Sequence, residues 1–170
     1  FNKEQLLGSV KEAISYNANT FMFYTGAPQN SFRSEINKEY TRMAKELMIE
    51  NNIDINNVIC HAPYIINLAN NTKKESYLFA INFLKDEIKR VAMLGVEKIV
   101  LHPGSYVSLD IDTGINNIIN ALNEVITPNQ DVKICLETMA GKGTETCFKL
   151  EHIKRIIDGV KYNDKVMVCL

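Results

Sequence analysis

Apolar positions along the chain follow two different spacings. Segments with an apolar residue every three or four positions predict amphipathic helices, and they cover residues 3–17, 35–50, 73–94, 112–126 and 148–158. Short, nearly continuous runs rich in Val, Ile, Leu and Cys lie between them and predict strands at 20–25, 57–61, 98–102, 132–137 and 165–170. Strands without apolar–polar alternation are typical of parallel sheets covered on both faces. The sequence therefore predicts an α/β protein in which a helix joins each strand to the next.

Two local signals mark the ends of the long helix predicted over 73–94. Thr72 stands where an N-cap is expected, with Glu75 three residues later, which is a capping-box pattern. Gly95 follows the last periodic residue, as a glycine in the left-handed conformation after a helix does.

Five predicted strands fit either an open parallel sheet or part of a closed (β/α)8 barrel, which needs eight strands and about 250 residues. No G-x-G-x-x-G follows the first predicted strand and "GKGTE" is not a Walker loop, so we expect no nucleotide cofactor. The chain begins in a predicted helix and ends in a predicted strand. If the fold is a TIM barrel, we expect residues 1–170 to form a single incomplete domain that lacks the first strand and the C-terminal units.

Composition adds limits on the class of protein. The chain has 170 residues, 46% of them hydrophobic and 23% charged, with a net charge of −1, which argues against a generally basic nucleic-acid binder but allows a locally basic groove. No apolar run is long enough to span a bilayer, so no membrane association is expected. The four cysteines show no CxxC pairing, and three of them (Cys60, Cys135 and Cys169) lie in apolar runs. We therefore expect free thiols and a cytoplasmic protein.

Three consecutive predicted strands finish on a potential metal ligand. His61 closes "NVICH", His102 closes "KIVLH" and Glu137 closes "KICLE". Neighbouring parallel strands lie about 4.8 Å apart, so these side chains are expected to converge at the carboxyl edge of the sheet, where α/β proteins place their chemistry. Two imidazoles and a carboxylate suit zinc. Each residue alone would more often be a hydrogen-bonded strand end. His152, within the last predicted helix, is interpreted as a core or surface histidine.

The loops after these strands predict a polar surface around such a site. "GAPQNSFR" offers amide side chains and Arg33, "APYIINLANN" offers Tyr64, and "AGKGTE" offers Lys142 in a glycine-rich loop. Gly104 and Ser105, directly after His102, offer backbone N–H groups. For a nucleic-acid substrate, Tyr64 would stack or wedge and the polar groups would contact the backbone.

Five sequence motifs of the chain resemble those of a known family. The stretches "TFMFYTGAPQN", "CHAPYIINLAN", "LHPGS", "LETMAGKGTE" and "FKLEHIKRIIDGV", in this order, are similar to endonuclease IV, the zinc-dependent apurinic/apyrimidinic endonuclease family of base excision repair. The resemblance covers essentially the whole chain and implies an eight-stranded TIM barrel with three zinc ions. It implies that about five strand–helix units are present here, corresponding to strands 2 to 6 of the family.

The resemblance also implies roles for individual residues. His61 and His102 match two histidines that bind one zinc, and Glu137 matches a catalytic glutamate that bridges this zinc to a second one. The ligands present would therefore bind one zinc, and Glu137 would also supply one ligand to a second zinc.

Further roles implied by the resemblance concern DNA. Tyr64 matches a tyrosine that enters the minor groove beside the lesion. Gln29 and Asn30 lie in the loop that the family inserts into the base stack, where some members carry Arg-Gln. Gly104, Ser105 and Lys142 are the further expected DNA contacts.

The activity implied is hydrolysis of the phosphodiester 5′ to an abasic site in double-stranded DNA by a zinc-activated hydroxide. We expect this hydrolase to be monomeric when complete, and this chain alone to be inactive. Two alternatives stay open at this stage. One is a metal-dependent sugar isomerase or epimerase of the xylose-isomerase-like barrel type, and the other is a non-catalytic fragment that binds DNA lesions.

Overall fold

The computed structural model describes residues 1–170 and contains one parallel sheet with the strand order β1-β2-β3-β4-β5. The strands are β1 (Met22–Phe23), β2 (Ile59–His61), β3 (Lys98–Leu101), β4 (Lys133–Glu137) and β5 (Val166–Cys169). The helices are α1 (Gln5–Ser15), α2 (Lys38–Glu50), α3 (Lys74–Leu94), α4 (Ile111–Val125) and α5 (Leu150–Gly159). Two short 3₁₀ helices, Ile55–Asn57 and Asn163–Lys165, precede β2 and β5. The predicted α/β class and order of elements are confirmed, with ends that differ by a few residues.

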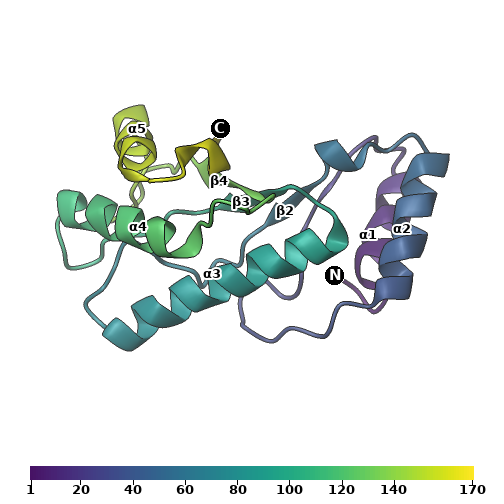
Figure 1. Ribbon diagram of the computed structural model, residues 1–170, viewed down its shortest axis with the longest axis horizontal. Coiled ribbons are helices and arrows are strands. Elements are labelled where there is room, and N and C mark those ends of the chain that lie inside the picture. The colour runs from purple at the N-terminus through teal and green to yellow at the C-terminus, as the bar shows by residue number, and fades with distance from the viewer.

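The helices pack in two groups, α1 with α2, and α4 with both α3 and α5. Figure 1 shows α1 and α2 side by side at one end of the molecule, followed by α3, α4 and α5 toward the other end. The apolar stripes predicted from the sequence lie between the helices and the sheet and form one core that includes Leu84 of α3, Ile99 of β3 and Ile134 of β4. The sheet therefore has one face that is covered by helices and an opposite face on which no helix packs.

The strand register decides which side chains occupy that second face. Cys60 pairs with Ile99, and Ile99 pairs with Ile134, so these three residues point toward the helices. Since side chains alternate along a strand, the residues next to them, such as His61 and Val100, point to the other face. His102 and Glu137 lie two positions beyond the paired residues Val100 and Cys135 and share that face. The register thus places all three predicted ligands on one side of the sheet.

The capping box predicted for the long helix is wrong. Lys73 occupies the N-cap position of α3 and makes no side-chain capping bond. Thr72 instead donates from its backbone N–H (3.1 Å) and its hydroxyl (2.8 Å) to Oδ1 of Asn70. The local turn formed by Asn70 therefore uses the groups that would have capped the helix. The C-terminal signal is confirmed, because Gly95 ends α3 with φ = 76° in the left-handed region.

The cysteines behave as small apolar residues. All four are free thiols, as predicted, and Cys60, Cys135 and Cys147 are buried. Burial raises the pKa of the Cys135 and Cys147 thiols to about 11, so both stay neutral near pH 7. None of the helices combines the length and the apolar character that a membrane span requires.

Leu84→Ala tests the position of the core. Leu84 is fully buried in the single apolar cluster, so its truncation is expected to lower the free energy of unfolding by about 2–5 kcal/mol. Urea denaturation followed by circular dichroism measures this change. The matched control is Ile49→Ala on α2, where the side chain is 77% exposed and a change within about 0.5 kcal/mol is expected. Equal losses in the two variants would contradict the packing described.

Candidate metal centre

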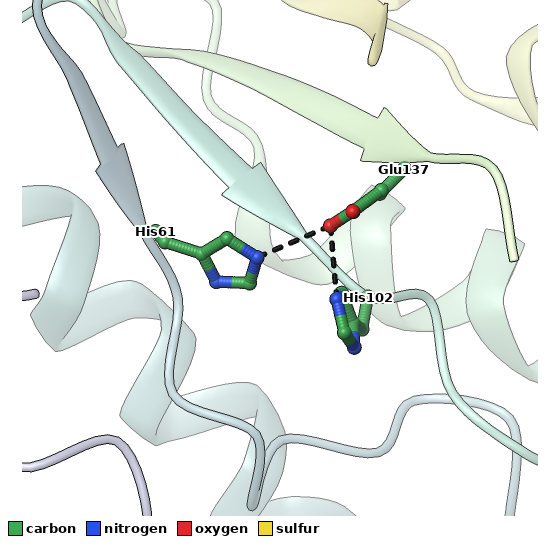
Figure 2. A group of neighbouring side chains, drawn as sticks. All are labelled: His61, His102 and Glu137. Carbon is green, nitrogen blue, oxygen red and sulfur yellow. Dashed lines mark hydrogen bonds and ion pairs between the residues drawn. The ribbon is translucent and has the colours of Figure 1, made fainter. Parts of the chain in front are cut away.

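Three side chains from three neighbouring strands meet above the carboxyl edge of the sheet. Figure 2 shows His61 at the end of β2, His102 directly after β3 and Glu137 at the end of β4 pointing toward one another. Nε2 of His61 lies 3.1 Å from Oε2 of Glu137, and Nε2 of His102 lies 2.9 Å from the same oxygen. One potential ligand atom from each residue lies within 4.8 Å of the others. The predicted convergence of these residues is therefore found, while their role as metal ligands stays a prediction.

The chemistry of this donor set fits a divalent cation. Nδ1 of His61 lies 2.7 Å from the carbonyl oxygen of Ala62, which can only accept a hydrogen bond, so Nδ1 carries a proton. In the neutral ring, Nε2 then presents a lone pair toward Glu137, and a backbone carbonyl on the other nitrogen is a common second partner for a metal-binding histidine. The Nε2 lone pair of His61 and the Glu137 carboxylate lie 3.1 Å apart and repel each other. A cation between them would bind both groups and remove this repulsion.

Two tyrosines surround the histidines. The Tyr64 ring is half exposed and lies edge-on to His61, with centroids 5.5 Å apart, and 5.2 Å from His102. The Tyr24 ring lies 5.1 Å from His61, and its hydroxyl donates to the Tyr64 hydroxyl at 2.5 Å. Burial and, after it, the hydrogen bond to Tyr64 raise the pKa of Tyr24 above its ordinary value, which keeps Tyr24 a donor. The Tyr64 side chain therefore contacts both imidazoles through its ring and Tyr24 through its hydroxyl.

Sequence reasoning missed Tyr24, because the signal for it lies in the strand register. Met22 pairs with Ile59 and therefore shares the face of His61, and Tyr24 follows Met22 by two positions. A side chain two positions along a strand returns to the same face, so Tyr24 projects toward the cluster. Only the strand register, which a single sequence does not reveal, makes this inference possible.

Hydrogen bonds connect each strand-end loop to the next. The Tyr64 N–H donates to the Pro28 carbonyl at 3.0 Å, which joins the loops after β1 and β2. Asn67 joins the loops after β2 and β3, because its Nδ2 donates to the Ser105 carbonyl (3.0 Å) and its Oδ1 accepts from the Ser105 N–H (3.1 Å). The Thr146 N–H and hydroxyl both donate to the Gly104 carbonyl, at 3.0 and 2.8 Å, and join the loops after β3 and β4. The four loops form one connected rim around the cluster.

The rim changes part of the predicted substrate surface. The sequence predicts a backbone N–H at Ser105 that faces the substrate, but this group donates to Oδ1 of Asn67 at 3.1 Å and is not free to bind a ligand. The sequence also predicts Arg33 as part of the polar surface around the site, but its Nε donates to the carboxylate of Glu87 at 2.6 Å and its side chain is only 8% exposed. Gln29, Asn30 and Lys142 are exposed, and their role as DNA contacts stays a prediction.

His152 lies outside the cluster, in agreement with its interpretation as a core or surface histidine. Its ring contacts the Phe148 ring edge-on with centroids 4.8 Å apart, and its Nδ1 is buried without a hydrogen-bond partner. Burial, followed by the nearby Lys149 and Arg155 charges, lowers its pKa. His152 therefore packs as a neutral ring.

Comparisons with known proteins support this description. Residues 10–170 match the model of the family described as Xylose isomerase-like TIM barrel. The chain is 52% identical over 168 residues to a protein named Probable endonuclease 4 from Bacillus thuringiensis (strain Al Hakam), an alignment that covers 98% of this chain and 56% of that protein. The chain thus spans about half the length of the curated relatives it matches. The resemblance read from the motifs is confirmed.

Two solved structures share the fold. Endonuclease IV from Thermus thermophilus superposes with a TM-score of 0.79 at 21% identity, over 100% of this chain and 59% of that one. A D-tagatose 3-epimerase-like protein superposes with a TM-score of 0.73 at 16% identity, over 96% of this chain and 61% of that one. At such identities these likenesses show the fold alone. Together with the family match they confirm the predicted TIM-barrel type, of which this chain holds five strand–helix units.

Gly104→Ala tests the rim. Gly104 has φ = 118°, and a Cβ there would lie 2.2 Å from Oδ1 of Asn67, the atom that accepts from Ser105. Gly143→Ala is the matched control, since Gly143 also has a positive φ of 62° but a Cβ there would meet no atom within 4 Å. The control is expected to cost about 1–2 kcal/mol of unfolding free energy from backbone strain. Gly104→Ala is expected to cost about 1–3 kcal/mol more, because hydrogen bonds of Asn67 are lost as well.

Denaturant titration of the two variants measures this difference. A Gly104→Ala variant no less stable than Gly143→Ala would show that Asn67 does not hold the rim together.

Proposed function

We infer a function for this chain from one premise: the chain belongs to the xylose isomerase-like TIM barrel family. We propose that the protein is a DNA-repair endonuclease that hydrolyses the phosphodiester 5′ to abasic sites. The observation that carries the proposal is the convergence of His61, His102 and Glu137 in a chain 52% identical to a Probable endonuclease 4. Since the chain spans 56% of the length of that relative, the activity is proposed for the protein in its full natural length.

The residues that would hold a zinc ion are His61 and His102 through Nε2, and Glu137 through its carboxylate. Such an ion supplies a Lewis acid that makes water a nucleophile near neutral pH and offsets the negative charge of a phosphodiester in the transition state. Glu137 contacts both histidines through a single oxygen, so its second oxygen is available to a further cation. This free oxygen supports the proposed bridging and catalytic role of Glu137, and three zinc ions are proposed for the complete site.

The remaining residues at the carboxyl edge would bind the DNA. Tyr64 is half exposed and hydrogen bonded to Tyr24. Its flat ring, beside the cluster, would contact an opened base step of the DNA. The Ser105 hydroxyl, the backbone at Gly104 and the exposed side chains of Gln29, Asn30 and Lys142 would contact the sugar-phosphate backbone. An abasic nucleotide costs less to rotate out of the helix than a stacked and paired one, which would favour the lesion. The proposed substrate is therefore double-stranded DNA with an abasic site, acted on by a cytoplasmic monomer without a nucleotide cofactor.

A sugar epimerase is the second candidate, because the fold also resembles a D-tagatose 3-epimerase-like protein. That likeness has 16% identity and concerns the fold alone. Isomerases and epimerases of this barrel type hold one divalent metal mainly with carboxylates, whereas two of the three converging side chains here are histidines. The donor set therefore favours the nuclease.

Loss of a ligand is expected to abolish tight zinc binding. His102→Ala removes one of three converging donors and is expected to weaken zinc binding by at least about 100-fold, measured by isothermal titration calorimetry. His152→Ala is the matched control, because His152 lies outside the cluster, and it is expected to bind zinc like the unaltered protein. Equal zinc affinity in both variants would exclude His102 from the metal site.

The activity itself is tested on a duplex oligonucleotide with one abasic-site analogue. The full-length protein with zinc is expected to nick the strand on the 5′ side of the lesion and to leave an intact duplex uncut. A chelator is expected to abolish the nick and added zinc to restore it. Binding of the abasic duplex without any nick would instead support a non-catalytic lesion-binding protein. Epimerisation of a ketose with no effect on DNA would support the sugar enzyme.

A further inference from the structure

Arg33 forms a buried ion pair between the loop after β1 and the middle of α3. Its Nε donates to Oε1 of Glu87 at 2.6 Å, and the two side chains are 8% and 0% exposed. The other carboxylate oxygen of Glu87 accepts from the Thr25 hydroxyl at 2.6 Å. The guanidinium also lies over the ring of Phe83, 4.9 Å from its centroid. Arg33 is therefore held in place by α3, and its side chain is not available for contact with DNA.

The same side chain fixes the shape of the loop that precedes it. Its Nη1 donates to the carbonyl oxygens of Phe32 (2.7 Å), Asn30 (3.1 Å) and Ala27 (3.4 Å). One planar group thus closes the loop 27–32 from inside, and this loop carries the exposed residues Gln29 and Asn30. Gly26 allows the approach, because a Cβ there would lie 2.7 Å from Nη1.

A second arginine, Arg90 of α3, binds the two ends of the loop. Arg90 donates from Nη2 to the Thr25 carbonyl (3.2 Å) and from Nη1 to the Ser34 carbonyl (2.8 Å). The loop is therefore attached to α3 at its start, inside and at its end. The loop is also joined to the loop after β2, because the Pro28 carbonyl accepts from the Tyr64 N–H.

A buried ion pair of this kind is poor evidence for added stability. The cost of removing two charges from water is often as large as their attraction, and apolar residues of similar size frequently replace such pairs without loss. What apolar residues could not reproduce are the three hydrogen bonds to backbone carbonyls of the loop. The pair therefore has a specific effect on loop conformation that packing alone would not provide.

We propose that Arg33, held by Glu87, is a positioning residue that keeps the loop 27–32 in the conformation that binds DNA and supports Tyr64. This inference rests on the proposed nuclease function and deepens it, because it assigns Arg33 to loop order and not to phosphate contact. A flexible loop would have to be ordered on binding, and fixing the backbone of even one residue corresponds to roughly a tenfold loss of affinity. The ion pair of Arg33 with Glu87, together with the hydrogen bonds of Arg33 to the loop, is called the clamp. Because the clamp orders the loop in the free protein, binding of DNA does not have to do so.

The decisive variant is the double substitution Arg33→Met with Glu87→Met. It removes both partners of the ion pair together, so neither stays buried without the other, and the protein is expected to remain folded. It also removes the acceptor of the Thr25 hydroxyl and the donors to the loop carbonyls. Glu124→Gln is the matched control, since Glu124 of α4 pairs with Lys85 of α3 on the exposed surface at 2.9 Å. Thermal unfolding measured by circular dichroism establishes that both variants are folded.

Hydrogen–deuterium exchange reads the loop directly. In the double variant the backbone amides of Asn30 and Phe32, which donate to the Ala27 carbonyl and to Oδ1 of Asn30, are expected to exchange at least about tenfold faster than in the unaltered protein, while those of β3 and β4 stay unchanged. The control is expected to exchange like the unaltered protein throughout. Unchanged exchange of the Asn30 and Phe32 amides in the folded double variant would overturn the proposed role of Arg33.

Binding and turnover of the abasic duplex separate positioning from other roles. The double variant is expected to bind about tenfold more weakly, with a raised KM, an unchanged kcat and an unchanged slope of log Kd against log salt concentration. An arginine that neutralised a phosphate would lower that slope by about one. A slope reduced by one, or an unchanged affinity, would overturn the proposal for Arg33. Failure of the unaltered protein to bind DNA would overturn the proposed function as well, whereas binding without cleavage by the unaltered protein would overturn the nuclease alone.

Discussion

The parallel register of β2, β3 and β4 is the constraint on which the candidate site depends. His61 pairs with Val100, and Val100 with Cys135, so His61 shares a face of the sheet with His102 and Glu137, which lie two residues farther along their strands. Neighbouring strands about 4.8 Å apart bring the side chains that follow them to within ligand distance of a common point. His61, His102 and Glu137 therefore converge without any long loop to carry them, and the apolar core beneath the strands fixes their position.

Above the strands, precision depends on hydrogen bonds between loops. Pro28 accepts from the Tyr64 backbone, Asn67 bonds both backbone groups of Ser105, and Thr146 donates twice to Gly104. Each of these bonds joins the loop after one strand to the loop after the neighbouring strand. The clamp formed by Arg33 and Glu87 attaches the first of these loops to α3 and thereby anchors one end of the rim.

The sequence predicted the features that follow from local periodicity and missed those that require long-range pairing. The order of helices and strands and the three strand-end ligands could be read because each strand finishes on a polar residue after an apolar run. Arg33 looked like an ordinary surface residue because its partner, Glu87, lies far along the chain. A charge at position 87, between the apolar positions 84 and 91 of the helix, was the available signal. The capping role of Thr72 failed because a nearby Asn competed for its hydroxyl.

The central claim is that three neighbouring strand ends form one metal site, and X-ray absorption spectroscopy of the zinc-loaded protein tests it most directly. The account predicts a first shell of nitrogen and oxygen at about 2.0–2.1 Å with the multiple scattering of two imidazole rings. A shell with sulfur at about 2.3 Å, or one without imidazole scattering, would contradict it, because neither could come from His61, His102 and Glu137.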